Sequence, residues 1–232
     1  LCEVLYGVTC SGTDSHIIAG IFPFSSPFPT VLGHESVGRV VKVGGKVRNY
    51  RIGDLVTRVG TPPPPGSGIS VTWGGFAEYG IAKDHWAMCA DGLPQSEWGG
   101  NRVNQVVPFA VDPRTAPMFT TWRETWSYVN RMGLGSGARV LVLGSGGNGL
   151  SFAAHAAIRG AARVVMAGAA RVEATARSVG VTGYVDYRKP DLVDAIKALE
   201  PQGFTIIIDA VGKRGISDAV LPLLAPGGLL GV

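Results

Sequence analysis

A glycine turn that follows an aliphatic run constrains the fold more than any other feature of this sequence. Val140–Leu143 is the aliphatic run, and Gly144, Gly146 and Gly149 follow it with the spacing G-x-G-x-x-G. In a strand–turn–helix unit, the first glycine permits the tight turn, the second lets a pyrophosphate approach the backbone, and the third permits close packing of helix on strand. The free N–H groups at the helix start attract the phosphates. We therefore predict a dinucleotide-binding turn made of Gly144, Gly146, Gly147, Asn148 and Gly149.

The residues around this turn alternate between strand-like and helix-like segments. A helix is predicted to end near Met132, and the glycine turn opens a helix that ends at Ile158. Strands are predicted at 163–167, 183–187, 204–209 and 228–232, with helices ending at 179, spanning 191–199 and spanning 216–224. Such alternation predicts a parallel sheet with right-handed crossovers, hence an α/β doubly wound domain. Its ligand crevice is expected outside the carboxyl ends of the strands.

Residues 1–112 have a different pattern. They are rich in valine, glycine and proline, and their short alternating runs predict a compact, barrel-like β domain. Strands are expected at 3–8, 37–43, 55–59 and 76–81, and His85 is expected in a surface loop. We therefore predict two domains, residues 1–112 and 113–232.

Composition narrows the class of partner. The 232 residues are 46% hydrophobic and 16% charged, and the 21 lysines and arginines behind the net charge of +4 are scattered. Scattered positive charge indicates neither a nucleic acid nor a membrane partner. Three cysteines without a C-x-x-C pair favour a reducing, cytoplasmic location, with Cys2 a small buried hydrophobe. The chain begins and ends within predicted strands, so we expect a fragment of a longer protein.

Two short stretches of the first domain carry polar chemistry. One is S-G-T-D-S-H at 11–16, and the other begins with Gly33, His34 and Glu35 and continues as G-H-E-x-x-G-x5-G-x2-V. Together with the glycine turn, these stretches resemble the medium-chain zinc-dependent alcohol dehydrogenase family over nearly the whole chain. The resemblance implies a GroES-like catalytic domain followed by a Rossmann domain, with an N-terminal strand and a C-terminal part missing.

The resemblance also implies a catalytic zinc ion. In that family a cysteine, the histidine of G-H-E and a second cysteine or acid hold the ion, as in the Cys2His site of alcohol dehydrogenase. Carried over, His34 matches the zinc histidine and Glu35 the adjacent acid, which can bind the ion or support its ligands. The first cysteine falls on Ser11, and Cys10 precedes it. In an extended segment, a shift of one residue turns the side chain to the opposite face, so Cys10 ligates zinc only if the chain bulges. The third family ligand falls on the threonines at 120–121, which are poor zinc donors.

Further roles follow from the same resemblance. Thr13 matches the hydroxyl that takes the alcohol proton, His16 the next member of the relay, and Asp14 the acid that orients His34. The alternative is that His34 and Glu35 form a hydrogen-bonded turn pair without metal. The family's structural zinc site has no counterpart, because a proline-rich stretch at 61–68 stands where its four cysteines would be.

The cofactor class is indicated at two strand ends. A dinucleotide fold normally carries an acid for the ribose 2′-hydroxyl at the end of its second strand. Here A-G-A-A at 167–170 and then Arg171 stand in that place, which favours NADP over NAD, although Arg171 is alternatively an ordinary surface residue. D-A-V-G at 209–212 resembles the family's loop under the cofactor's sugar, which implies contacts from Asp209 and Val211.

These observations predict an NAD(P)-dependent oxidoreductase that interconverts an alcohol and its aldehyde or ketone with the help of zinc. Two alternatives stay open. Ser11 and Thr121 favour a zinc-free quinone or enone reductase on the same scaffold, and an incomplete ligand set also permits a protein that binds NADPH without turnover. The family layout further implies a small-molecule substrate and a homo-oligomer, either a dimer or a tetramer.

Overall fold

The protein is described by a computed structural model in which residues 1–10, 12–23 and 27–232 are placed. Ser11, which the family resemblance puts at a ligand position, lies outside the described residues. The chain divides into two compact units, Leu1–Thr120 and Thr121–Val232. The division falls inside helix α4 (Phe119–Arg131), whereas the sequence suggested a boundary before that helix. Among the described residues, no helix is long and apolar enough to cross a membrane.

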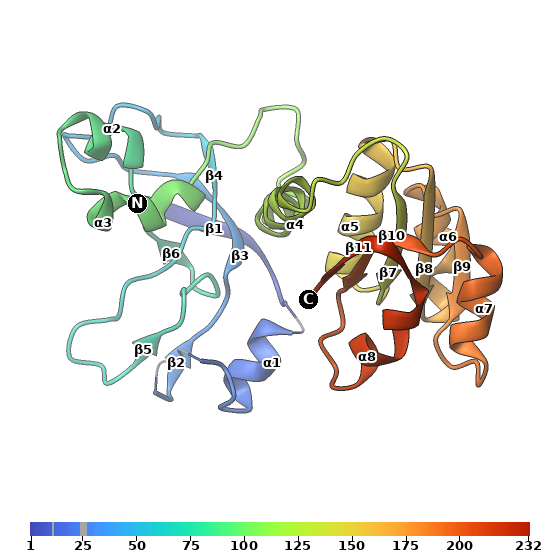
Figure 1. Ribbon diagram of the computed structural model, residues 1–232. Coiled ribbons are helices and arrows are strands. Elements are labelled where there is room, and N and C mark those ends of the chain that lie inside the picture. Colours follow the sequence, from blue (N-terminus) through green and yellow to red (C-terminus); the bar gives the residue numbers. More distant parts are fainter. Residues whose placement is uncertain (11, 24–26) are drawn as a thin grey trace. The chain divides into compact units, whose positions relative to one another are not determined.

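Unit 1 is built on an antiparallel sheet with the strand order β4-β3-β1-β6 (Figure 1). The strands are β1 (Cys2–Val8), β3 (Glu35–Val40), β4 (Leu55–Thr57) and β6 (Tyr79–Gly80), and β2 (Thr30–Val31) pairs with β5 (Ser70–Val71) beside them. Cys2 and four other buried side chains form a core under the sheet: Val40, Tyr50, Val56 and Val59. The predicted β character and the burial of Cys2 are confirmed; β1 is one residue longer than predicted, whereas β3, β4 and β6 are shorter.

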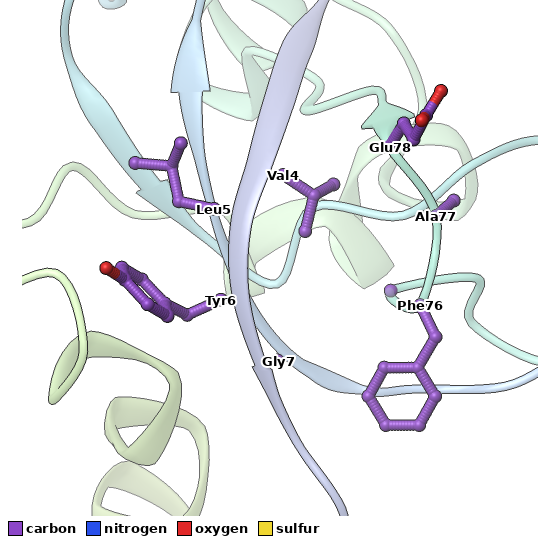
Figure 2. A pocket seen from close by; sticks show the side chains of 8 residues that line it. Val4, Leu5, Tyr6, Gly7, Phe76, Ala77 and Glu78 are labelled. Atoms are coloured by element: carbon purple, nitrogen blue, oxygen red, sulfur yellow. The ribbon is translucent and has the colours of Figure 1, made fainter.

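Strand β1 contains a β-bulge that changes the direction of its later side chains. Val4 pairs with Gly38 and Tyr6 with Val37, so Leu5 is an extra residue in β1. Accordingly, Leu5 and Tyr6 lie on the same side of the strand (Figure 2), where a regular strand would place them on opposite sides. The strand ends at Val8, before helix α1 (Thr13–Ile18). Simple alternation along an extended segment therefore does not apply to Cys10.

Short helices that the sequence did not indicate complete unit 1. They are α2 (His85–Ala90), α3 (Gln95–Trp98) and the 3-10 helix η1 (Gly99–Val103). The 3-10 helix η2 (Ala116–Met118) belongs to the helix predicted to end near Met132. The prediction of a surface loop at His85 is wrong: His85 is 5% exposed and is the first residue of α2. The helix forms because Asp84 accepts a hydrogen bond from the Ala87 backbone N–H at its N-terminus.

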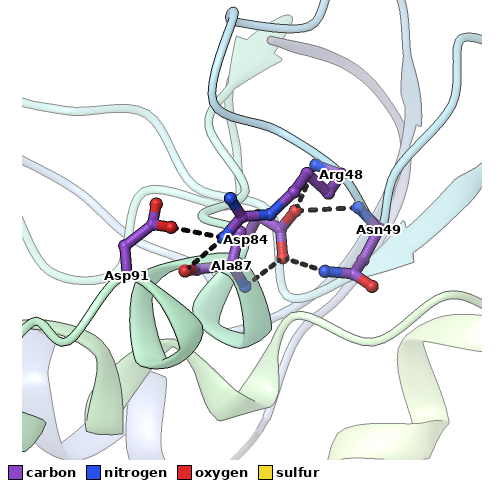
Figure 3. A network of polar contacts seen from close by, with 5 residues as sticks. All are labelled: Arg48, Asn49, Asp84, Ala87 and Asp91. Carbon is purple, nitrogen blue, oxygen red and sulfur yellow. Dashed lines mark hydrogen bonds and ion pairs between the residues drawn. The ribbon is translucent and has the colours of Figure 1, made fainter.

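Asp84 also fastens α2 to the loop at Arg48 and Asn49 (Figure 3). Its carboxylate accepts hydrogen bonds from the backbone N–H groups of Arg48 (2.8 Å) and Asn49 (2.9 Å) and from the Asn49 amide (2.9 Å). Burial alone raises the pKa of a carboxyl group, but these donors and Ala87 outweigh it, so the pKa of Asp84 lies below its ordinary value. Asp84 is thus held as a charged, buried anchor.

We expect the substitution Asp84→Asn to lower the free energy of unfolding at pH 7 by about 2 kcal/mol, because an amide presents an NH2 group to buried donors. A carboxyl group with a lowered pKa stabilises the fold above its unfolded pKa and loses that contribution as the pH falls through its folded pKa. The difference between wild type and variant should therefore shrink below about pH 4. Urea unfolding at several pH values measures this difference.

The control is Asp91→Asn, which removes the more exposed carboxylate partner of Arg48. A surface pair of this kind contributes about 0–1 kcal/mol, so the control should stay close to wild type. Equal losses from both variants would contradict the anchoring role of Asp84.

Unit 2 is a five-stranded parallel sheet with the strand order β11-β10-β7-β8-β9 (Figure 1). Its strands are β7 (Arg139–Leu143), β8 (Arg163–Gly168), β9 (Gly183–Asp186), β10 (Phe204–Asp209) and β11 (Leu224–Gly231). The connecting helices are α5 (Gly147–Ile158), α6 (Glu173–Ser178), α7 (Leu192–Leu199) and α8 (Ile216–Val220), with 3-10 turns η3 (Ala170–Val172) and η4 (Leu221–Leu223). The predicted α/β alternation and parallel sheet are confirmed.

Each face of this sheet is covered by helices. Side chains that alternate along the strands divide between two cores: Val140, Val142 and Met166 face α4, α5 and α6, whereas Leu141 and Val165 face α7 and α8. Burial on both faces explains why the strands read as continuous aliphatic runs. The predicted helix 216–224 is too long: α8 ends at Val220, and β11 begins at Leu224.

Candidate active site

Three potential metal ligands gather in unit 1. The ligand atoms of Cys10, His34 and Glu35 all lie within 4.8 Å of one another. The sheet explains this meeting, because Val8 at the end of β1 pairs with Glu35 at the start of β3. His34 and Glu35 are buried, and Cys10 is partly exposed.

The donor set fits a zinc ion. Thiolate, imidazole and carboxylate are the usual zinc ligands, and metal–ligand distances of about 2.0–2.3 Å place the donors of a tetrahedral ion roughly 3.5 Å apart. Donor atoms within 4.8 Å need only a small contraction to reach that geometry. Nδ1 of His34 is also buried without a hydrogen-bond partner. The chemistry and the spacing of the three donors therefore fit the ion.

Charges in the cluster favour the ligand form of the thiol. The hydrogen bond with His34 is the largest influence on Cys10, and it outweighs burial, so the pKa of the thiol lies below its ordinary value. Burial lowers the pKa of His34, but its hydrogen bond with Cys10 and the nearby acidic groups outweigh this and raise that pKa overall. The thiolate is the form that binds metal.

Asp14 and Thr13 support this cluster from α1. Oδ2 of Asp14 accepts a hydrogen bond from the Cys10 backbone N–H at 3.0 Å, which ties Cys10 to α1. Oδ1 of Asp14 lies 3.8 Å from Nδ1 of His34, too far for a hydrogen bond but close enough to attract a charged imidazole. The Thr13 hydroxyl accepts from the Cys10 thiol at 3.5 Å. His16 is exposed three residues further along α1, and no hydrogen bond among the described residues joins it to Thr13.

A groove of about 500 Å³ lies elsewhere in unit 1, between β1 and residues 75–78 (Figure 2). The ring of Phe76 would contact a β-carbon added at Gly7 or Gly33, so it fills the space over both glycines. The groove is lined by none of the predicted site residues.

In unit 2 the glycine turn has the predicted geometry. Gly144 has φ +97°, which favours glycine, and a β-carbon added at Gly149 would overlap the carbonyl oxygen of Gly144. No side chain caps the start of α5 after Gly146, and a β-carbon added at Gly146 would meet nothing within 4 Å. Gly147 and Asn148 are exposed in the first turn of α5. The turn therefore leaves open space in front of free N–H groups.

A cavity of about 370 Å³ lies beside this turn. The neighbouring strands β7 and β10 are followed there by α5 and α8, which cover opposite faces of the sheet. Val211 lines the cavity and lies against Gly144. The Asp209 carboxylate is occupied within its own loop, because it accepts from the backbone N–H groups of Val211 (2.9 Å) and Gly212 (3.0 Å) and from the Ser217 hydroxyl (2.9 Å). Asp209 therefore shapes the loop that presents Val211.

Two residues that the sequence did not single out organise the end of β8. The Ser145 hydroxyl accepts a hydrogen bond from the Ala169 backbone N–H at 3.0 Å, and the Tyr184 hydroxyl donates to the Ala169 carbonyl at 2.7 Å. Arg171 is exposed and lies two residues after Ala169. Burial raises the pKa of Tyr184, and the positive charge of Arg171 acts in the opposite direction. Only the spacing of Ser145 within the glycine turn could have drawn attention to this contact.

Comparison with known proteins matches both units to one family. Residues 4–92 match the alcohol dehydrogenase GroES-like domain, and residues 147–232 match the zinc-binding dehydrogenase domain. The chain belongs to the zinc-binding medium-chain alcohol dehydrogenase family. The family and the two-domain fold predicted from the sequence are thereby confirmed.

Named members of this family resemble the chain along most of its length. It is 29% identical to geraniol dehydrogenase of Castellaniella defragrans, covering 90% of this chain and 63% of that protein. It is 28% identical to the NADP-dependent isopropanol dehydrogenase of Clostridium beijerinckii, covering 86% and 59%. A solved structure described as a zinc-binding dehydrogenase of Sinorhizobium meliloti 1021 bound to NADP is 27% identical, with a TM-score of 0.74, and covers 100% and 68%. The chain thus spans about three fifths of the length of the curated relatives it matches.

Proposed function

We propose that the protein is an NADP-dependent oxidoreductase that interconverts an alcohol and its aldehyde or ketone at a zinc ion. The observation that carries this proposal is the cluster of Cys10, His34 and Glu35, whose ligand atoms lie within 4.8 Å of one another in a member of the zinc-binding family. Relatives named for alcohol oxidation support it. In this proposal unit 1 holds the substrate and unit 2 holds the cofactor.

The residues of unit 1 have distinct tasks in this scheme. Cys10, His34 and Glu35 hold the zinc ion, which when bound supplies Lewis-acid polarisation of the substrate oxygen. Asp14 positions the Cys10 backbone and faces His34. The Thr13 hydroxyl, beside Cys10, takes the alcohol proton at Oγ1 and passes it toward His16 and solvent. Hydride transfer itself belongs to the nicotinamide.

The residues at the end of β8 favour NADP over NAD. A β-carbon at Gly168 would come within 2.5 Å of the Tyr184 hydroxyl and 2.6 Å of the Ser145 hydroxyl. The last position of β8 therefore has no room for the acid that grips a ribose 2′-hydroxyl in NAD enzymes. Exposed Arg171 stands close by to pair with a 2′-phosphate. The similar dehydrogenase of Sinorhizobium meliloti, whose structure was solved with NADP bound, agrees with this preference.

We expect Arg171→Ala to weaken NADPH binding roughly 10- to 100-fold, which is the value of a hydrogen-bonded charge pair. NADH binding should change little, because that cofactor has no phosphate at the 2′ position. Fluorescence titration with each cofactor measures both affinities. Arg177→Ala is the matched control, because Arg177 is paired with Glu173 on α6. If both cofactors lose affinity equally, Arg171 does not read the 2′-phosphate.

The proposed function is tested by metal analysis and by turnover on the same preparation. About one zinc per chain and NADP reduction by alcohols are expected. A metal-free protein that reduces quinones or enones would establish the zinc-free alternative instead. NADPH affinity without hydride transfer to any carbonyl or enone would establish the binding protein.

The setting of this activity belongs to the same proposal. We expect a homo-oligomer, a dimer or tetramer, that acts on small molecules in the cytoplasm. The expectation of a reducing compartment comes from the cysteine pattern of the sequence. The mass of the native protein in solution measures the oligomeric state.

A further inference from the structure

A strained tryptophan stands beside the proposed metal site. The ring centroids of Trp73 and His34 are 5.0 Å apart, at an interplanar angle of 53°. Trp73 is partly exposed, whereas His34 is buried. The indole therefore forms the boundary between the cluster of potential ligands and the surface of unit 1.

The backbone of Trp73 has a conformation that bulky residues avoid. Its φ is +67°, and Arg58 has φ +54°; among the described residues these two alone of the non-glycine residues have positive φ. Such a conformation costs about 1–3 kcal/mol, and residues that retain it concentrate at binding and catalytic sites. Both strained residues belong to one contact group, because the Arg58 guanidinium carbon lies 5.6 Å from the centre of the Trp73 ring.

Neighbouring segments hold this conformation in place. A β-carbon at Gly60 would overlap the Trp73 carbonyl oxygen, so the two backbones touch directly. The Arg58 N–H donates to the Ser36 carbonyl at 2.6 Å, which ties the second strained residue to β3 directly after Glu35. The Phe22 ring packs edge-on against the indole, with centroids 5.7 Å apart. The indole is thus a fixed wall rather than a mobile surface side chain.

We propose that Trp73 is the specificity-determining residue of the site and selects alcohols and aldehydes that carry a planar unsaturated group next to the reacting carbon. The proposal rests on the proposed function. If the zinc ion at this cluster held the substrate oxygen, the reacting carbon would be one bond away, and its substituent would come near the indole, whose ring centroid is 5.0 Å from that of His34. An aromatic or conjugated substituent gains stacking on that ring in addition to apolar burial, whereas a short alkyl group gains much less.

The test compares Trp73→Phe with Trp73→Leu in the full-length protein. Both replacements keep a bulky side chain on the strained backbone, and only the first keeps an aromatic ring. The readout is the ratio of kcat/KM for benzyl alcohol to kcat/KM for 1-propanol. Trp73→Leu should lower this ratio roughly three- to tenfold, and Trp73→Phe should hold it within about twofold.

A second readout does not depend on turnover. Benzamide and propionamide resemble the two carbonyl products and are not reduced, so calorimetry can compare their dissociation constants in the zinc-loaded protein. The preference for benzamide should fall roughly three- to tenfold in Trp73→Leu and persist in Trp73→Phe. Trp98→Phe, in α3, is the control, because the Trp98 indole donates only to the Leu93 carbonyl.

The outcomes separate the two proposals. If wild type oxidises neither alcohol, the proposed function fails and this inference fails with it. If wild type oxidises both and neither ratio changes in Trp73→Leu, only the role of Trp73 is overturned. Equal losses for both substrates in Trp73→Leu would also overturn it, because a purely structural role lowers both rates together.

Discussion

Replacing Cys10 with serine is expected to empty the metal site and to lower kcat/KM for alcohol oxidation roughly 1,000-fold. Hydroxyls are weak zinc donors, and two remaining protein ligands do not retain the ion at ordinary concentrations. Loss of Lewis-acid polarisation removes several kcal/mol of transition-state stabilisation, which corresponds to that factor in rate. Zinc content should fall from about one to below about 0.1 per chain. Atomic absorption and steady-state kinetics on the same preparation measure both effects.

Two controls make this result specific. Cys89→Ser removes an exposed thiol on α2 and should change neither zinc content nor rate. Ser11→Ala alters the position to which the family resemblance assigns the cysteine, and it should retain the ion if Cys10 has taken over that task. Full zinc content in Cys10→Ser, with loss in Ser11→Ala, would show that the ligand is Ser11.

The second large effect is expected in the glycine turn, where neighbouring glycines have separable tasks. Gly149→Ala places a methyl group onto the carbonyl oxygen of Gly144, so the turn must open. Overpacking against backbone costs about 3 kcal/mol, which lowers the melting temperature of a chain of this size by roughly 6–12 °C. NADPH binding should be lost as well, because the free N–H groups of α5 no longer converge on the phosphates.

Gly146→Ala is the matched variant. The added methyl group meets no protein atom within 4 Å, so the melting temperature should stay within about 1 °C of wild type. The same methyl group stands where the pyrophosphate approaches the backbone, so NADPH affinity should fall roughly 10- to 100-fold. Calorimetric melting and NADPH fluorescence titration separate the two variants. If Gly146→Ala binds NADPH with normal affinity, the pyrophosphate does not bind at this turn.

The sequence alone was sufficient for the parts of the fold that depend on local pattern. The strand–turn–helix unit at Gly144 and the parallel alternation after it follow from spacing and periodicity, because a close backbone approach admits glycine only. The family followed from the resemblance of the glycine turn and the G-H-E stretch to known motifs. Strand lengths and the short helices of unit 1 did not follow. They depend on individual side chains such as Asp84, whose hydrogen bonds to Arg48 and Asn49 join segments more than 30 residues apart.

The residues of the candidate site likewise fall into those that the sequence identified and those that only the tertiary structure revealed. The motif resemblance identified His34 and Glu35 as ligands. It allowed Cys10 as a ligand only if the chain bulges, because a shift of one residue in a regular strand turns the side chain to the opposite face. The bulge at Leu5 and the hydrogen bond from the Cys10 N–H to Asp14 hold the thiol near His34, and neither can be predicted from the local sequence. Trp73 needed the tertiary structure altogether, since its backbone strain and its position beside His34 arise where segments distant in the sequence pack together. Local pattern fixes which residue types are available, and long-range packing decides which of them meet.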